Sequence, residues 1–204
     1  IIEASDVEIS NLEISNINVS DRNGACIRIG SKGENISLLN IYCHDSQNGI
    51  LGSFGKGLLN VKDSIFERCG FGGRAHGAYI QMNGSMVFDN VHFLATKGAG
   101  HSLKVSGKTI LIENSIIAAL SGHNSRAIDF FGGGIIVIRN SIVQQGKKSE
   151  NTDMFGLSME MHRLQKGKHS LLLENDWLIF DNQSTRLLNL LVENRGKLFR
   201  GNKL

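Results

Sequence analysis

The sequence predicts an all-β solenoid in which short strands stack coil upon coil. Three observations support this prediction: a pattern that recurs about every 25 residues, 24 glycines among 204 residues, and the absence of proline. Short units cannot bury an apolar face alone, but stacked units can. Proline would remove donors from hydrogen-bond ladders that run through the whole molecule. We therefore expect residues 1–204 to form one domain, a single-stranded parallel β-helix of about seven to eight coils.

The first repeated unit is a short alternation of apolar residues that ends in Asn or Asp. Period-two alternation is typical of a strand with one buried face. We expect the amide and carboxylate side chains to turn inward at one corner of each coil and to satisfy buried turn backbone there. The repeated positions are Asn16, Asn40, Asp63, Asn90, Asn114, Asn140 and Asn175.

A second alternating unit runs in phase with the first and predicts a second stack of strands. Gly24, Gly49, Gly77 and Gly132–Gly134 fit corners that need unusual backbone angles. The unit occurs at residues 24–29, 49–51, 77–82, 101–105, 126–130, 153–157 and 186–190.

Alternation assigns the residues of these second strands to rows. The inward row should contain Ile27, Ile80, Leu103, Ile128 and Leu188. One outward row should contain Arg28, Gln81, Lys104, Asp129 and Asn189, and the next Cys26, Tyr79, Ser102 and Ala127.

Composition and charge disfavour several classes of protein. Frequent Leu, Ile and Val with mixed charges disfavour disorder. No stretch approaches the roughly 20 apolar residues of a membrane helix, so we expect no membrane span. A net charge of +3 is far from that of a dedicated nucleic-acid binder. A β-sandwich would lack a fixed repeat with an in-phase Asn, and a leucine-rich repeat would need a helical segment in each unit.

The cysteines and the chain ends give further expectations. Cys26, Cys43 and Cys69 cannot all pair and lack metal-ligand spacing, so we expect small apolar residues in the core or ladders. The chain starts at Ile1 and shows no capping helix at either end. We expect a processed or truncated piece of a longer chain, with further β-helix coils or a homo-oligomer partner covering its ends.

Four segments carry a family resemblance: His76–Ile80, Gly100–Lys104, Arg126–Gly134 and Gln144–Asn151. With the repeat, they resemble bacterial right-handed parallel β-helix repeat proteins of the pectate-lyase-like superfamily. The resemblance implies a right-handed coil and, commonly, action on extracellular polysaccharides, so we expect a secreted or periplasmic protein. Three specific identities are disfavoured. The sequence lacks the calcium-binding acidic clusters of pectate lyases, the Gly-His-Gly and Arg-Ile-Lys elements of polygalacturonases, and the Asp-Pro-His-Asp motif of mannuronan epimerases.

Basic and imidazole residues follow one edge of the predicted rod, where a groove would suit an extended anionic polysaccharide. We expect no metal or other cofactor. Cleavage of a uronate by β-elimination needs a cation at the carboxylate, a base for the C5 proton and an acid for the leaving oxygen. We assign these roles, in that order, to Arg126 or Arg74, to Lys104, His101 or His76, and to Tyr79. Substrate-binding candidates are Arg74, Gln81, Arg28, His123, Lys97 and Asn189.

Other interpretations of these residues remain open. Lys104 and Asp129 could form a surface ion pair between neighbouring coils, and His76 and His101 could bind turn backbone. A glycoside hydrolase could use Asp129 and Asp153 as its acid pair. A non-catalytic tailspike-like or adhesin-like scaffold would bind glycans without cleaving them. Glu160 lies in an irregular insertion that we expect to wall one end of the groove.

Overall fold

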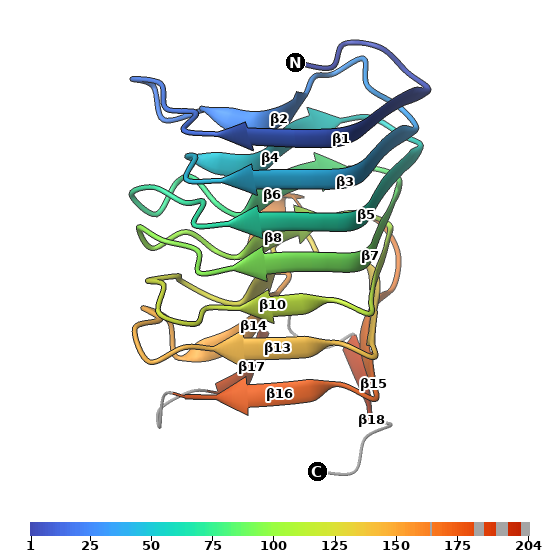
Figure 1. Ribbon diagram of the computed structural model, residues 1–204. Helices are drawn as coiled ribbons and strands as arrows, with labels where there is room; N and C mark the ends of the chain where they lie inside the picture. Colours follow the sequence, from blue (N-terminus) through green and yellow to red (C-terminus); the bar gives the residue numbers. More distant parts are fainter. Residues whose placement is uncertain (164, 182–185, 191–195, 201–204) are drawn as a thin grey trace.

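The protein is a parallel β-solenoid of about six turns, in which the first and the last described strands lie at opposite ends of the stack (Figure 1). The computed structural model describes residues 1–163, 165–181, 186–190 and 196–200. Its strands form two sheets, one of eleven and one of seven strands. All named strand pairs are parallel, and each residue pairs with the equivalent residue one coil away. The turn count is slightly below the expected seven to eight coils, and the predicted fold is confirmed.

The first sheet contains the strands that end in the Asn or Asp repeat, and in later coils it divides into two branches. Its main path is β1 (Val7–Ser15), β3 (Ile36–His44), β5 (Leu58–Glu67), β7 (Ser85–Leu94), β9 (Thr109–Glu113), β12 (Ile135–Arg139), β15 (His169–Glu174) and β18 (Gly196–Arg200). A branch from β7 contains β10 (Ile116–Ala118), β13 (Ile142–Gln145) and β16 (Trp177–Phe180).

The second sheet contains the other repeated unit and carries the candidate functional residues. Its strands are β2 (Ala25–Ile29), β4 (Asn48–Phe54), β6 (Ala78–Met82), β8 (Leu103–Ser106), β11 (Ile128–Phe130), β14 (Asp153–Leu157) and β17 (Arg186–Leu190). A short 3-10 helix, η1 (Met161–Arg163), lies between β14 and β15.

Apolar side chains from both sheets fill the interior of the coils. Burial of this continuous apolar surface is the main source of stability in such a stack. The rings of Phe66 and Phe93 stack with centroids 5.0 Å apart. The buried row of the second sheet contains Ile27, Ile50, Ala78, Leu103, Ile128 and Phe155.

The expected register of β6 is wrong by two residues. Ala78, not Ile80, aligns with Leu103, so Tyr79 and not Gln81 aligns with Lys104. Alternation fits both registers, because a shift of two residues keeps every side chain on its face. The corner at Gly77 decides between them, since a Cβ there would lie 2.1 Å from the Ser102 carbonyl oxygen.

The outward rows differ accordingly from those expected. The row that continues from Arg28 contains Leu51, Tyr79, Lys104, Asp129, Gly156 and Asn189. Gln81 aligns with Ser53 and Ser106. Ser102 and Ala127, expected on the next outward row, are buried directly before their strands.

The repeated Asn and Asp residues do not turn inward, contrary to expectation. Asn40, Asp63, Asn90, Asn114 and Asn140 are exposed and have φ between 51° and 54°. This left-handed conformation suits Asn and Asp, whose short polar side chains bond locally. Their side chains link neighbouring coils from outside, as when Asn114 donates to Asp89 Oδ1 at 2.8 Å.

The next residue in the chain satisfies the buried turn backbone instead. Ser64 Oγ accepts from the Ile41 amide at 3.0 Å, Ser115 Oγ from Val91 at 3.0 Å, and Ser141 Oγ from Ser115 at 3.1 Å. In the last described rung, Asp176 Oδ1 accepts from Ser141. A serine ladder therefore performs the role expected of the amides.

The corner glycines serve close packing more than unusual angles. Of those predicted, only Gly133 and Gly134 have positive φ. A Cβ on Gly49 would lie 2.3 Å from the Gly77 carbonyl oxygen. Because successive corners touch backbone to backbone, a side chain would separate the coils.

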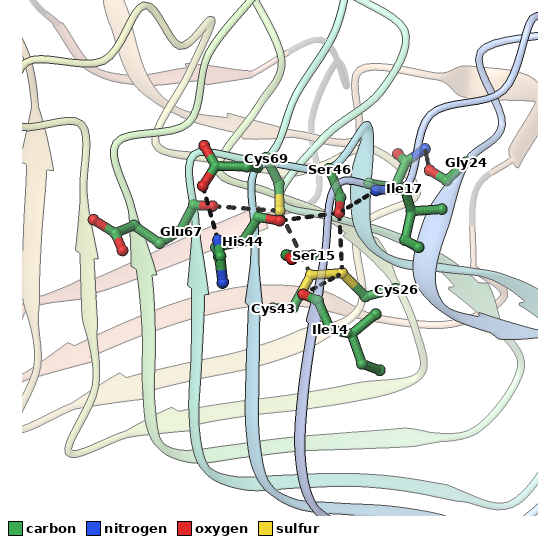
Figure 2. Close-up of a disulfide and its surroundings, with 12 residues drawn as sticks. Ile14, Ser15, Ile17, Gly24, Cys26, Cys43, His44, Ser46, Glu67 and Cys69 are labelled. Atoms are coloured by element: carbon green, nitrogen blue, oxygen red, sulfur yellow. Dashed lines mark hydrogen bonds and ion pairs between the residues drawn. A yellow bond between two sulfur atoms is a disulfide. The ribbon is translucent and has the colours of Figure 1, made fainter.

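Two of the three cysteines form a disulfide, which the sequence did not predict (Figure 2). Cys26 on β2 and Cys43 on β3 have Cα atoms 6.1 Å apart. The coil brings the two sheets together at this point, although 17 residues separate the cysteines in sequence. Cys69 is a buried free thiol whose sulfur lies 3.7 Å from Cys43 Sγ.

The described part of the chain contains no helix long and apolar enough to cross a membrane.

Candidate functional site

The insertion between β14 and β15, described at residues 158–163 and 165–168, crosses the outer face of the second sheet toward earlier coils. The Glu160 amide donates to the Phe131 carbonyl oxygen. Its carboxylate pairs with Lys104 Nζ on β8 at 2.8 Å. Gln165 Nε2 donates to Ser106 Oγ and to the Met82 carbonyl oxygen, both at 3.0 Å. The insertion therefore covers the sheet at β8 and β11 and reaches the end of β6, as a wall of the expected groove would.

Tyr79 lies where the insertion meets the open part of the sheet. Arg163 Nη1 donates to its hydroxyl oxygen at 2.5 Å. Lys104 Nζ lies 5.0 Å from the centre of the Tyr79 ring, and Phe131 packs edge-on at 5.6 Å. The hydroxyl group is thereby fixed by one cation while a second cation lies over its ring.

A pocket of about 480 Å³ opens beside Tyr79, over β2, β4 and β6. This volume lies within the range of small-molecule and cofactor sites. The lining is mostly polar, with two arginines and one carboxylate. It comprises Glu3, Asn23, Arg28, Ile29, Gly30, Ser31, Leu51, Gly52, Ser53, Tyr79, Gln81 and Arg163.

His76 and His101 are buried behind Tyr79 and bind turn backbone. The His101 amide donates to His76 Nδ1 at 2.9 Å, and the Arg126 amide donates to His101 Nδ1 at 3.1 Å. The two rings stack at 5.2 Å, and His76 meets the Tyr79 ring edge-on at 5.3 Å. Because each Nδ1 accepts a hydrogen bond, the proton of each neutral ring is on Nε2.

Burial keeps both imidazoles neutral. It lowers the pKa of His76 to about 3, and the charge of Lys104 adds to this effect. Burial also lowers the pKa of His101 well below its usual value, with further lowering by His76, Lys104 and Arg126. The backbone contacts and burial favour a structural role for these two rings.

Asp129 and Arg126 form a buried charged cluster with Asp153. Arg126 Nη2 lies 3.2 Å from Asp153 Oδ2, and its Nη1 lies 3.8 Å from Asp129 Oδ2. His101 Nε2 is 3.4 Å from the same Asp129 oxygen. Burial raises the pKa of Asp129, although Lys104 and Arg126 act in the opposite direction. Asp129 Oδ1 and Arg126 Nε lack hydrogen-bond partners among the described residues.

The structure gathers some of the predicted site residues and separates others. Tyr79, Lys104, His76, His101, Arg126 and Asp129 form one connected group. Arg28 and Gln81 line the pocket with Tyr79. Arg74, Lys97 and His123 are exposed outside the pocket lining, where His123 pairs with Glu150 and Lys97 approaches Asp45. Asn189 continues the outward row on β17, and its side chain is outside the described part of the chain.

Of the pocket residues that the sequence did not indicate, Arg163 is the one that donates a hydrogen bond to Tyr79. The repeat predicts contacts between neighbouring coils, whereas Arg163 and Tyr79 are 84 residues apart in sequence. The only signal was the long step between the Asn repeats at Asn140 and Asn175, which located the insertion without indicating its path.

Comparison with known proteins gives one match. A family model described as the right-handed beta helix region matches residues 1–156. No curated protein and no solved structure matches the chain. The matched region contains Tyr79, Arg28 and Gln81, whereas Arg163 and the rest of the insertion follow it.

Proposed function

Because the chain belongs to the right-handed β-helix family, we propose that its pocket binds an acidic polysaccharide and cleaves it by β-elimination. The fold supports a polysaccharide-associated protein. The finer proposal is carried by one observation: the Tyr79 hydroxyl is held by Arg163 at the wall of a polar pocket.

The pocket suits an anionic sugar in charge and polarity. Arg28 and Arg163 contribute two cations to the lining, against one carboxylate from Glu3, and Arg163 also pairs with Glu160 at 3.3 Å beside the pocket. Arginine binds carboxylates with a rigid fork of N–H donors, and Gln81 and Ser53 add neutral hydrogen-bonding groups. Sugar hydroxyls and a uronate carboxylate would use both kinds of partner.

β-Elimination at a uronate moves one proton and breaks one carbon–oxygen bond. A base removes the C5 proton, and the electron pair of that C–H bond forms the C4=C5 double bond. The C4–O bond breaks, and the leaving oxygen takes up a proton. In this proposal the Tyr79 oxygen, as phenolate, accepts the C5 proton and the resulting hydroxyl donates it to the leaving oxygen.

The neighbouring cations have electrostatic roles in this scheme. Negative charge builds up on the substrate carboxylate as the C5 proton leaves. Arg163 is the cation nearest the reacting hydroxyl, and Lys104 stands behind the ring, paired with Glu160. Arg126 is engaged by two buried carboxylates, so Arg163 replaces it as the cation for the substrate carboxylate.

The Cys26–Cys43 disulfide supports a secreted or periplasmic location, because structural disulfides persist in oxidising compartments. Polysaccharides of the cell exterior would be accessible there.

The test is ultraviolet absorbance of the unsaturated product, measured on pectate, alginate and glycosaminoglycans. Tyr79→Phe should lower the rate at least about 100-fold, the lower range for loss of an acid–base group. Tyr42→Phe is the matched control, since Tyr42 is on the other sheet and bonds Glu67. Absence of product on every acidic glycan, or equal rates for the two variants, would overturn the proposal.

A non-catalytic glycan-binding role is the second candidate. Two observations favour this role: Lys104 is paired with Glu160, and His76 and His101 are buried. Few side chains at the pocket are therefore free to act as an acid or a base. Saturable binding of an acidic glycan without unsaturated product would establish this alternative.

A further inference from the structure

The pocket is closed at one end, and we infer that it takes the terminus of a polysaccharide chain rather than an internal stretch. This inference rests on the proposed function, because it concerns how the same pocket holds its glycan.

Access along the outward row changes sharply at one coil. Arg28 on β2 is exposed, and Leu51 and Tyr79 on the next two coils are half-buried. The side chain of Lys104 is only 14% exposed, and that of Asp129 only 4%. The row is therefore open over β2, β4 and β6 and covered at β8 and β11.

The insertion covers these residues, and its side chains hold it to the sheet at several points. Glu160 is paired with Lys104, Arg163 is bonded to Tyr79, and Gln165 is bonded to both β6 and β8. The Arg163 guanidinium also lies 5.8 Å from the Phe131 ring centre. A polymer along the row would meet this wall directly beyond Tyr79.

The open length is short. Two strand spacings separate β2 from β6, which is about 10 Å. A glycan that enters over β2 would end against Arg163, so the uronate beside Tyr79 would belong to the terminal part of its chain. Such a pocket should release short products from chain ends instead of cutting at random.

The experiment measures how many protein molecules bind each glycan chain. Size-defined oligogalacturonates or oligoalginates of two lengths are titrated into the Tyr79→Phe protein by calorimetry, so that cleavage does not intervene. The inference predicts one protein per chain at both lengths. A number of bound proteins that rises with chain length would overturn the inference while preserving glycan binding. Absence of binding to every acidic oligosaccharide would overturn the proposed function, and the inference with it.

Product size gives an independent readout with the wild-type protein. End-specific cleavage should yield a short product from the earliest times, while most of the polymer keeps its length. An early ladder of intermediate lengths, with a rapid loss of viscosity, would contradict it.

The three sulfur atoms carry a second inference, independent of the pocket. We propose that Cys69 can exchange with the disulfide, so that Cys43 bonds alternately to Cys26 and to Cys69. Cys43 Sγ lies between the other two sulfurs, bonded to Cys26 and 3.7 Å from Cys69 Sγ (Figure 2). The Cys69 thiolate would attack Cys43 Sγ, the Cys43–Cys26 bond would break, and Cys26 would leave as a thiolate and take up a proton. No external oxidant is needed.

The exchange would move the free thiol from a buried to a more open position. Cys69 is buried, whereas Cys26 is half-buried and lies within 3.4 Å of Ser46 Oγ. Burial raises the pKa of the Cys69 thiol to about 11, so exchange should become faster as the pH rises toward that value.

Peptide mapping after alkylation of the unfolded, unreduced protein tests this proposal. Cys26→Ser, held with glutathione disulfide as the oxidant, should contain a Cys43–Cys69 disulfide, and the matched Cys69→Ser variant treated in the same way should retain Cys26–Cys43. Wild-type protein held at alkaline pH should show part of its alkylation at Cys26. A Cys26→Ser protein with two alkylated thiols, together with wild-type label confined to Cys69 at every pH, would overturn it.

Discussion

At the scale of single residues, Arg126 holds together charges that the fold has removed from water. Its guanidinium faces Asp129 and Asp153, whose side chains are 4% and 3% exposed. Asp153 also has Arg186 as a partner, whereas the neighbour that Asp129 would retain within 3.4 Å is the neutral imidazole of His101. The cluster therefore depends on Arg126 mainly through Asp129.

Arg126→Ala should lower the free energy of unfolding by about 3–5 kcal/mol, because it leaves a buried carboxylate without its cation. Urea unfolding measures the change. Arg139→Ala, which breaks a surface pair with Glu113, should cost no more than about 1 kcal/mol. An equal loss in the free energy of unfolding for the two variants would show that the Arg126 cluster is solvated.

His76 gives a pH-dependent contribution to stability whose sign follows from its lowered pKa. In the unfolded chain the imidazole titrates near its usual value of about 6.5, whereas in the folded chain its pKa is about 3. Between these values the unfolded state binds the proton more readily. The free energy of unfolding should therefore fall as the pH drops below about 6.5, and level off near pH 3.

His76→Asn should remove this part of the acid sensitivity, while its amide oxygen can still accept from the His101 amide. The measurement is urea unfolding of both proteins from pH 7 to pH 4. The difference between the two pH profiles of stability reports His76 alone, because groups such as Asp129 contribute equally to both. The raised pKa of Asp129 makes the folded state more stable as the pH falls, which is opposite to the effect of His76. Parallel pH profiles would contradict the buried neutral imidazole.

At the scale of elements, the serine ladder joins each turn of the first sheet to the next. The Ser115 hydroxyl accepts from the Val91 amide and donates to the Glu113 carbonyl oxygen at 2.7 Å. Each rung satisfies a buried amide of the neighbouring coil. The ladder thus fixes the corner at which the strands of the first sheet bend or divide.

Ser115→Ala should lower the free energy of unfolding by about 1–3 kcal/mol, because it leaves the buried Val91 amide without an acceptor. The exposed Ser121→Ala is the control and should change stability by less than about 0.5 kcal/mol. Thermal or urea unfolding compares the two. A Ser115 variant as stable as the control would show that water replaces the rung.

The residue before each rung must adopt a left-handed backbone. Asn114 has φ of 51°. Asn114→Val should destabilise the protein by about 1–2 kcal/mol more than Asn114→Gly, because glycine enters this conformation without strain and a β-branched residue does not. Both variants lose the amide contact to Asp89, so their difference in urea unfolding reports the backbone alone. Equal stabilities would argue against strain at this corner.

The repeat predicted the strands and the sheets but not every side-chain direction. Alternation assigns faces, and the stacked coil follows from it. It did not distinguish two registers of β6, since Ala78 and Ile80 both face inward. The Asn positions were recognised, but their outward direction depends on a positive φ that alternation does not encode.

At the scale of the whole molecule, the candidate site depends on contacts that no repeat contains. Tyr79, Lys104 and Asp129 share a row because the coils stack in register. The insertion then covers the row at β8 and β11 and brings Arg163 to Tyr79. Sequence reasoning identified the insertion and several members of the cluster. It did not identify Arg163 or the disulfide, because both depend on the path of the chain in space.

The pocket bounded by Arg28, Tyr79 and Arg163 is the proposed glycan site. A crystal structure of the Tyr79→Phe protein with a bound acidic oligosaccharide tests it most directly. We expect sugar density over β2, β4 and β6, with a uronate carboxylate at Arg163 and the glycan chain ending at the insertion. Sugar bound on another face of the coil, with this pocket empty, would contradict it.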